Sequence, residues 1–342
     1  MRLSFWMGGL RAGLRMLTLR RAYHGMSVLS SYFLARWKIA WLPPRYPLFI
    51  GVEPTTACNL HCPQCISGIR GFTRPTGRLS PQTLEALLAE LQPYLWGVLF
   101  YFQGEPLLHP QIAQLILLAS RYRLLTSLST NGHFLTEETT YALIAAGLTH
   151  IRISVDGLTQ STYQQYRQGG DLSQVQAGIE TLVAQRQRMR SRFPLIELQM
   201  IAFKHNLHEV PLFREWAYKL GADAARIKTA QLLSPDPASY ETWIPEPLSR
   251  YQRQPDNTLQ LKGNLPNHCW RLWRAAEITW DGQVLPCCFD KDAQHSFGSL
   301  NGQKFAQLWH SPQAEAFRRT VFQNRKNIDI CQNCTEGART WL

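Results

Sequence analysis

The feature that most constrains the fold is a regular alternation of short apolar segments with longer amphipathic ones between residues 46 and 232. The short segments have the length and composition of β-strands, and the longer ones repeat apolar residues every three or four positions, as α-helices do. The expected strands are 48–52, 98–102, 125–129, 151–155, 196–201 and 225–228. The expected helices are 81–91, 111–121, 137–146, 172–189 and 209–220. This order predicts an α/β fold, a partial (β/α)6 TIM-like barrel with function at the carboxyl ends of its strands.

Local signals mark several helix ends. Ser80-Pro81 combines an N-cap residue with proline at the first helical position, and Thr136 precedes two acidic residues. Gly147 and Gly221 stand where helices should stop.

We divide the chain into four parts. Residues 1–45 form a basic, aromatic-rich arm, expected to be helical, and residues 46–232 form the barrel. Residues 233–263 are rich in proline and read as a connector. Residues 264–342 contain a second group of cysteines and are expected to form a small cysteine-rich domain.

The positive charge is concentrated in the arm. Residues 1–45 carry eight basic residues and no acidic one: Arg2, Arg11, Arg15, Arg20, Arg21, Arg36, Lys38 and Arg45. The rest of the chain has 28 basic and 24 acidic residues, which leaves it only mildly basic. We therefore expect no nucleic-acid partner, although the overall net charge is +12.

The eight cysteines lie in two tight groups, 58–65 and 269–334. Such clusters in a large chain indicate metal binding rather than disulfides. Thiolate ligands need a reducing compartment, so we expect a cytoplasmic protein. The sequence contains no run of eighteen apolar residues, so we expect no helix that spans a membrane.

Cys58, Cys62 and Cys65 follow the first expected strand directly, in the pattern C-x3-C-x2-C. Three thiolates can hold three irons of a [4Fe-4S] cluster and leave the fourth iron without a protein ligand. An open iron can bind the amino and carboxylate groups of a methionine-type ligand. Zinc is the alternative, but a structural zinc site needs a fourth ligand, and His61 is poorly placed to supply it.

This run resembles the radical SAM superfamily, whose signature is CxxxCxxC after the first strand. The resemblance implies a [4Fe-4S] cluster that reductively cleaves S-adenosylmethionine to a 5′-deoxyadenosyl radical, which abstracts hydrogen from a substrate that the sequence does not identify. It also implies an external electron donor of the flavodoxin or ferredoxin type. The family commonly has an aromatic or hydrophobic residue at the position of Gln64. This difference affects packing against the adenine ring and does not affect iron ligation.

Later strand ends resemble family segments that line the cofactor pocket. The implied cofactor-binding residues are Gln103, Gly104, Glu105, Pro106, Asn131, Ser154, Asp156 and Arg167. Glu105 would accept a bond from the ammonium group of the methionine moiety, and Arg167 would pair with its carboxylate. The simpler alternatives are an ordinary turn at Gly104, a capping turn at Asp156 and a solvated loop arginine at Arg167. No residue is assigned as the catalytic acid or base.

The second cysteine group resembles the SPASM extension of radical SAM enzymes in a shortened form. Cys269, Gly282 and Cys287 match its opening, and Asp281-Gly282 predicts a hairpin turn that brings Cys269 and Cys287 together. The resemblance implies one auxiliary [4Fe-4S] cluster, because Thr340 stands where a further cysteine would be. Its expected ligands are Cys269, Cys287, Cys331 and Cys334, with Cys288 as a spare whose side chain points away from Cys287. Four thiolates also suit structural zinc.

The arm mixes apolar residues with arginines at helical spacing. Such a helix can pack on the barrel as a lid, lie on an anionic membrane surface as a peripheral contact, or bind an acidic partner or peptide. Among its later residues, those expected to be more buried than the first twenty are Tyr32, Phe33, Trp37, Ile39 and Trp41.

The function predicted from these patterns is that of a radical SAM enzyme acting on a small molecule or peptide in a net oxidation or modification that the auxiliary cluster assists. A peptide- or protein-modifying maturase of the SPASM type is one alternative. A non-catalytic iron–sulfur or zinc scaffold is the other.

Overall fold

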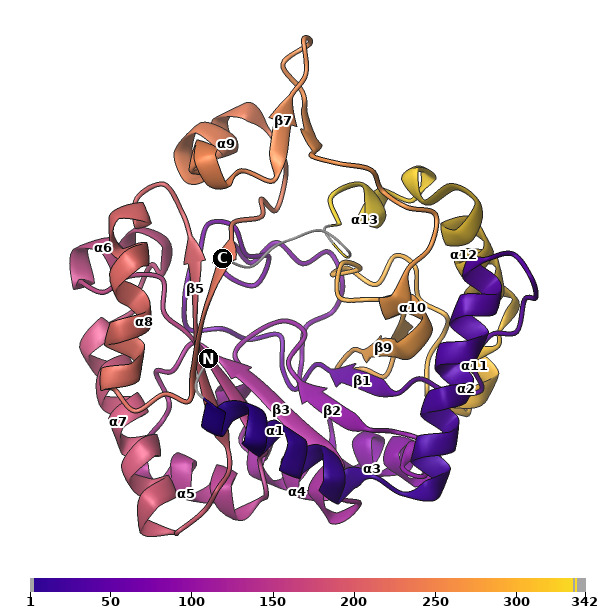
Figure 1. Ribbon diagram of the computed structural model, residues 1–342, viewed down its shortest axis with the longest axis horizontal. Helices are drawn as coiled ribbons and strands as arrows, with labels where there is room; N and C mark the ends of the chain where they lie inside the picture. The colour runs from indigo at the N-terminus through magenta and orange to yellow at the C-terminus, as the bar shows by residue number, and fades with distance from the viewer. Residues whose placement is uncertain (1–2, 335, 337–342) are drawn as a thin grey trace.

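A computed structural model describes residues 3–334 and residue 336 of the chain. Its main sheet has eight strands in the order β10-β9-β1-β2-β3-β4-β5-β6. Their bounds are β1 Phe49–Val52, β2 Gly97–Phe100, β3 Leu125–Thr130, β4 His150–Ser154, β5 Leu195–Ala202, β6 Ala224–Thr229, β9 Ala275–Ile278 and β10 Val284–Leu285. The six expected strands are present, all parallel, and they curve into an open barrel (Figure 1).

Helices cover the outer face of this sheet (Figure 1). Those of the barrel are α3 Pro81–Leu91, α4 Ile112–Arg121, α5 Glu137–Ala145, α6 Gln160–Tyr166, α7 Leu172–Arg188 and α8 Val210–Lys219. All five expected helices form, and α6 is additional. Ser80 and Thr136 cap α3 and α5 through their hydroxyl groups, as predicted. Gly147 and Gly221 follow α5 and α8 with φ of +85° and +88°.

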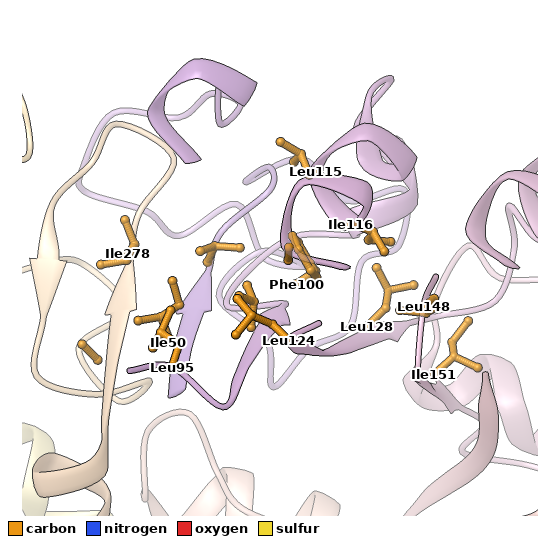
Figure 2. Packing of buried hydrophobic residues seen from close by; sticks show 14 of the residues in the cluster. Ile50, Leu95, Phe100, Leu115, Ile116, Leu124, Leu128, Leu148, Ile151 and Ile278 are labelled. Carbon is orange, nitrogen blue, oxygen red and sulfur yellow. The ribbon is translucent and has the colours of Figure 1, made fainter. Parts of the chain in front are cut away.

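The main core lies between the outer face of the sheet and these helices. Figure 2 shows Phe100 of β2 beside Leu115 and Ile116 of α4, with further aliphatic side chains from neighbouring strands. Ile50 and Ile278 extend the same core across β1 and β9. Burial of these side chains holds each strand in a register that aims its alternate residues into the barrel.

The C-terminal region joins the barrel sheet directly. Strand β9 pairs in parallel with β1, placing Ala275 opposite Phe49, and β10 returns antiparallel to β9. The predicted hairpin around Gly282 is therefore confirmed, with Gly282 at φ +84°. The helices of this region are α10 Trp270–Arg274, α11 Phe305–Trp309, α12 Pro312–Asn324 and α13 Asp329–Gln332. Residues 233–263 contain helix α9, Pro237–Trp243, and a two-stranded sheet of β7, Tyr251–Arg253, with β8, Leu259–Leu261.

The arm forms helices α1, Leu3–Met16, and α2, Leu19–Arg36. Buried Arg21 of α2 donates hydrogen bonds to the carbonyls of Met16, Gln92 and Tyr122, each at the C-terminal end of a helix. A guanidinium among such carbonyls satisfies acceptors that a helix end otherwise leaves unpaired. This contact fixes the arm to the barrel.

The expected burial of the later arm residues is only partly correct. Tyr32 is buried against Trp273 and Phe322 of the C-terminal region, and Phe33 and Trp41 are half-buried. Trp37 and Ile39 are exposed, contrary to expectation, because they lie at the C-cap of α2 and just beyond it, where the chain leaves the core. No helix within residues 3–334 is long and apolar enough to cross a bilayer.

Candidate active site

The first three cysteines lie in the loop after β1, at the C-terminal end of the sheet. Cys58 and Cys65 both act electrostatically on Cys62, so the three thiols share one small region. The loop folds tightly around them. A Cβ atom at Gly68 would lie 2.4 Å from the carbonyl oxygen of Cys62 and 2.5 Å from its nitrogen, so only glycine fits there.

Burial dominates the chemistry of these thiols. It raises the pKa of Cys62 to about 12, an effect that the charge of Arg167 opposes. The pKa of Cys58 is also raised by burial, although its Sγ accepts a hydrogen bond from the Leu60 amide at 3.5 Å. Such thiols become thiolates only when a metal compensates their charge, as in a bound iron–sulfur cluster.

A buried ion pair ties the far part of this loop to the C-terminal region. Arg74 donates two hydrogen bonds to the fully buried carboxylate of Glu53, at 2.9 Å and 2.5 Å. Its Nε also donates to the Lys291 carbonyl at 2.8 Å, and the Trp280 amide donates to Glu53 at 3.2 Å. This pair holds the cluster loop against β9, and no sequence pattern predicted it.

Gln103, Gly104, Glu105 and Pro106 follow β2 and face the cysteine loop. Gly104 has φ +70°, and a Cβ atom there would lie 2.2 Å from the Thr55 carbonyl oxygen, so the close approach requires glycine. The amide of Glu105 donates to the Ala57 carbonyl at 2.7 Å. Gln103 and Pro106 are buried beside them, and Pro106 opens a short 3₁₀ helix that ends at Leu108. The structure thus brings this segment next to the first cysteine group.

The Glu105 carboxylate is buried but richly hydrogen-bonded. Oε1 accepts from Leu107 at 3.0 Å and Thr130 at 2.6 Å, and Oε2 accepts from the Asn131 amide at 2.7 Å. Burial raises the pKa of Glu105, and these donors act against that rise. A carboxylate has about four acceptor sites, so one site on Oε2 remains for an outside donor.

Asn131 connects the end of β3 to the cysteine loop. Its side-chain Nδ2 donates to Asn59 Oδ1 at 2.7 Å, beside Cys58. Its own Oδ1 accepts from the amide of His133 at 3.1 Å. Neither Asn59 nor His133 was singled out in the sequence, because single polar residues in loops carry no spacing signal.

Asp156 and Arg167 form an ion pair beneath the cysteine loop. Arg167 Nε donates to Asp156 Oδ2 at 2.7 Å, and Asp156 Oδ1 accepts from the Ile201 amide at 2.6 Å. Within the described part of the chain, Asp156 is the only hydrogen-bonding partner of the Arg167 side chain, which leaves Nη1 and Nη2 available. The side chain of Arg167 is only 13% exposed. The alternative of a solvated loop arginine is therefore wrong, since the charge is buried beside Cys62.

Replacing Arg167 with lysine tests whether Nη1 and Nη2 of Arg167 bind a ligand. Lysine keeps the charge but loses the planar fork that binds a carboxylate through two nitrogens. For S-adenosylmethionine, the ligand that the sequence resemblance implies, we expect the KM to rise about tenfold to a hundredfold, the equivalent of one charge-assisted hydrogen bond. Steady-state kinetics check this, with iron content measured beside it. An unchanged KM in a variant with full iron content would exclude Arg167 from carboxylate binding.

The inside of the barrel is polar along β4, β5 and β6. Buried Glu197 pairs with Arg152 at 2.6 Å and Arg226 at 2.7 Å. Although burial alone would raise the pKa of Glu197, His150 and Arg152 lower it to about 2. Ser154 lies opposite Gln199 one step nearer the cysteine loop, half-buried, as expected for a side chain that faces the barrel interior.

The second cysteine group gathers around Cys269. Burial raises the pKa of Cys287, Cys331 and Cys334, and Cys269 adds a smaller electrostatic contribution to each, which places these thiols in one region. The Sγ of Cys269 accepts from the Leu272 amide at 3.5 Å as it caps α10.

Arg325 lies among these thiols and was not anticipated. It is 1% exposed, and its Nη2 donates to Cys334 Sγ at 3.2 Å. It also hydrogen-bonds Cys331, opposing the effect of burial, which raises the pKa of that thiol. N–H donors to cysteine sulfur are among the contacts that set the reduction potential of an iron–sulfur cluster.

Cys288 has different surroundings. The groups that act on its pKa beyond burial include Arg271, Glu277 and Lys228, on the barrel side. Burial also dominates at its neighbour Cys287, where Cys288 and, more weakly, Cys269 raise the pKa further and Arg271 lowers it. Within the described residues, no three His, Cys, Asp or Glu side chains converge closely enough to share one metal ion. The assignment of each group to a cluster therefore rests on the cysteine pattern and its surrounding donors.

Comparison with known proteins agrees with this geometry. Residues 52–196 match the sequence profile of the Radical SAM superfamily, and residues 269–335 match that of SPASM, an iron–sulfur cluster-binding domain. The chain belongs to the radical SAM superfamily. Its cofactors are accordingly a [4Fe-4S] cluster, S-adenosylmethionine and auxiliary iron–sulfur binding in the form of clusters held by the SPASM region.

Two curated relatives cover most of this radical SAM enzyme. The AdoMet-dependent heme synthase of Methanosarcina barkeri is 26% identical over 310 residues, 80% of this chain and 84% of the relative. The PqqA peptide cyclase of Gluconobacter oxydans is 26% identical over 321 residues, 87% of this chain and 85% of the relative. Streptococcus suis SuiB bound to precursor peptide SuiA is a structural neighbour, with TM-score 0.62 and 13% identity over 87% of this chain and 72% of that one. This last likeness shows a shared fold.

Proposed function

We propose that this radical SAM enzyme binds S-adenosylmethionine at the carboxyl ends of β1 to β4 and uses it to oxidise or modify a substrate held inside the barrel. The observation that carries the proposal is convergence. Gly104, Glu105, Asn131 and Arg167, from three separate strand–helix connections, contact or act on the loop of Cys58, Cys62 and Cys65. A plain strand–helix turn would not need such contacts.

The side chains of this site have distinct proposed roles. The remaining acceptor site of Glu105 would bind the ammonium of the methionine moiety, while Arg167 would hold its carboxylate, kept in place by Asp156. Asn131 and Ser154 would line the remainder of the cofactor pocket. Cys58, Cys62 and Cys65 would hold the cluster, which supplies the electron that cleaves S-adenosylmethionine to a 5′-deoxyadenosyl radical.

We propose a single auxiliary [4Fe-4S] cluster on Cys269, Cys287, Cys331 and Cys334. An iron–sulfur cluster needs neighbouring thiolates, whose sulfurs accept N–H hydrogen bonds. Cys334 meets both conditions, since it lies near Cys269 and Cys331 and accepts from Arg325, whose positive charge would offset that of the thiolates. Cys288 stays outside the set because it faces Lys228 and Glu277.

A small polar molecule is the substrate class we favour. The charged pairs around Glu197 make the barrel interior polar, and a polar interior suits a polar substrate better than an apolar one. A peptide is the alternative, supported by the relative named PqqA peptide cyclase, whereas the relative named heme synthase supports a small molecule.

We further propose a cytoplasmic enzyme that receives electrons from a flavodoxin or ferredoxin type of donor and touches a membrane through its arm. The arm is helical and fixed to the barrel by Arg21 on one side only, which leaves its outer residues exposed. A non-catalytic scaffold remains the competing function.

Anaerobic reconstitution with iron and zinc analysis tests the proposal. Two cubane clusters predict about eight irons per chain, and S-adenosylmethionine should then yield 5′-deoxyadenosine with dithionite. About four irons would remove one of the two clusters. A chain that holds zinc, no iron and no cleavage activity would support the scaffold instead.

A further inference from the structure

The arm presents many large apolar side chains to solvent. Those on α1, α2 and the residue pair between them are here named the apolar ridge: Trp6, Met7, Leu10, Leu14, Leu17, Leu19, Tyr23, Met26 and Leu29. Trp6, Leu10 and Leu14 are 62%, 65% and 62% exposed. Among the described residues, twelve of the seventeen exposed large hydrophobic side chains lie between positions 6 and 42. Soluble monomers rarely gather exposed apolar side chains in this way.

Packing on the barrel does not explain this surface. The opposite face of α1 already packs: Ala12 is buried with Phe193 and Leu195, and the Phe5 ring lies edge-on to His150. Gly8 approaches the Leu195 side chain so closely that a Cβ atom would lie 2.5 Å from it. Helix α1 is thus apolar on its buried face and also on its exposed face, and a helix that only covered a core would be polar outside.

The charges beside the ridge identify its partner. Arg11, Arg15 and Arg20 are exposed among the ridge residues, and the first acidic residue of the chain is Glu53. Apolar side chains flanked by arginines, without acids, fit the boundary between headgroups and acyl chains of a bilayer that carries anionic lipids. We propose that the apolar ridge docks the enzyme on an anionic lipid bilayer. This inference rests on the proposed membrane contact and names its residues and lipid class.

A second copy of the chain fits the ridge less well. A symmetric dimer places the same surface of both copies face to face. Arg11, Arg15 and Arg20 would then meet their own counterparts, and no acid in the first 52 residues could pair with them. Like charges brought together at an interface oppose association.

The fold gives the docked enzyme an orientation. Helix α1 covers the N-terminal ends of the strands. It contacts Leu125, His150 and Leu195, which are the first residues of β3, β4 and β5. The cysteine loop lies at the opposite ends of the strands. Docking through α1 therefore turns the mouth of the barrel away from the bilayer, toward dissolved substrate and electron donor.

Vesicle flotation of the reconstituted full chain tests docking. Vesicles of phosphatidylcholine alone are compared with vesicles that mix phosphatidylcholine and phosphatidylglycerol at about three to one. We expect at least a tenfold greater bound fraction on the anionic vesicles, reduced by salt, because surface charges are screened. The double variant Leu10→Glu/Leu14→Glu should lose this binding. Leu212→Glu on α8, where the leucine is 58% exposed, is the matched control and should keep it.

Three outcomes would overturn the inference. They are equal binding to neutral and anionic vesicles, equal binding by the double variant, or a dimer in light scattering that the double variant dissociates without any vesicle binding. Release of 5′-deoxyadenosine without vesicles reports on the proposed function separately. For the orientation, vesicles should protect Arg11 and Arg20 from trypsin but leave exposed Arg70, in the cysteine loop, open to cleavage; protection of Arg70 instead would refute it.

Discussion

Replacing Cys62 with alanine should abolish release of 5′-deoxyadenosine and remove about four of about eight irons per chain. Cys62 is 5% exposed, lies within the electrostatic reach of Cys58 and Cys65, and has Gly68 packed against its backbone, so no other thiol is placed to substitute for it. We expect cleavage of S-adenosylmethionine to fall at least about a thousandfold, the equivalent of roughly 4 kcal/mol in the barrier. Chromatographic detection of 5′-deoxyadenosine with dithionite checks this.

Cys288→Ala is the matched control for that variant. Cys288 is half-buried and adjoins Cys287 in sequence, but the charges that act on it include Arg271 and Lys228 of the barrel side, and it lies outside the proposed ligand sets. The control should keep about eight irons and normal cleavage. Persistence of cleavage in Cys62→Ala would remove this group of three from the mechanism. Loss of iron in Cys288→Ala would show that the ligand set of the auxiliary cluster is assigned wrongly.

Most of the site was predictable because its signals are local in sequence. Cys58, Cys62 and Cys65 stand at fixed spacing after a strand, and the Gly104-Glu105 turn follows the next strand. Parallel strands place their carboxyl ends along one edge, so position in the alternation already determines that these segments meet. The contact of Glu105 with the Ala57 carbonyl is the physical result.

The parts that sequence reasoning missed depend on contacts between distant residues. Helix α6 has the sequence QSTYQQY, with no apolar repeat, yet Tyr163 and Tyr166 are buried on it. Because this helix was not expected, Arg167 at its C-cap could be interpreted as a solvated loop residue. Arg325 likewise meets Cys334 only because the 3₁₀ turn Arg325–Asn327 packs against α13. Isolated arginines carry no pattern that reports such burial.

The arm illustrates the limit differently. Its composition allowed barrel packing and a free apolar face, and the structure has both on opposite sides of α1. Periodicity alone could not separate these faces, since each repeats at helical spacing. Arg21 of α2 fixes the arm to the barrel through carbonyls of residues as distant as Tyr122, a contact that no local pattern reports.

Arg74→Met should destabilise the protein by about 3 to 5 kcal/mol at neutral pH, because it leaves the Glu53 carboxylate buried without its partner. Glu53 is fully buried and receives two hydrogen bonds from Arg74, while the side chain of Arg74 is 8% exposed. The Trp280 amide alone cannot replace a cation. Denaturant unfolding followed by fluorescence measures the change, and Arg78→Met, at an exposed arginine of the same loop, should stay within about 0.5 kcal/mol.

The pH dependence of this loss distinguishes a buried charge from lost packing. Burial already raises the pKa of Glu53 in the wild type, against the opposing effect of Arg74, and removing Arg74 must raise it further. A carboxyl whose pKa is higher in the folded state stabilises the fold while protonated and loses that contribution as pH rises through its folded pKa. The destabilisation of Arg74→Met should therefore be smallest in acid and grow toward neutral pH. Adding Glu53→Gln should recover most of it, since a neutral amide costs less to bury than an unpaired carboxylate. A loss of equal size at every pH, unrelieved by Glu53→Gln, would instead assign the effect to packing of the Arg74 side chain on the Phe72 ring.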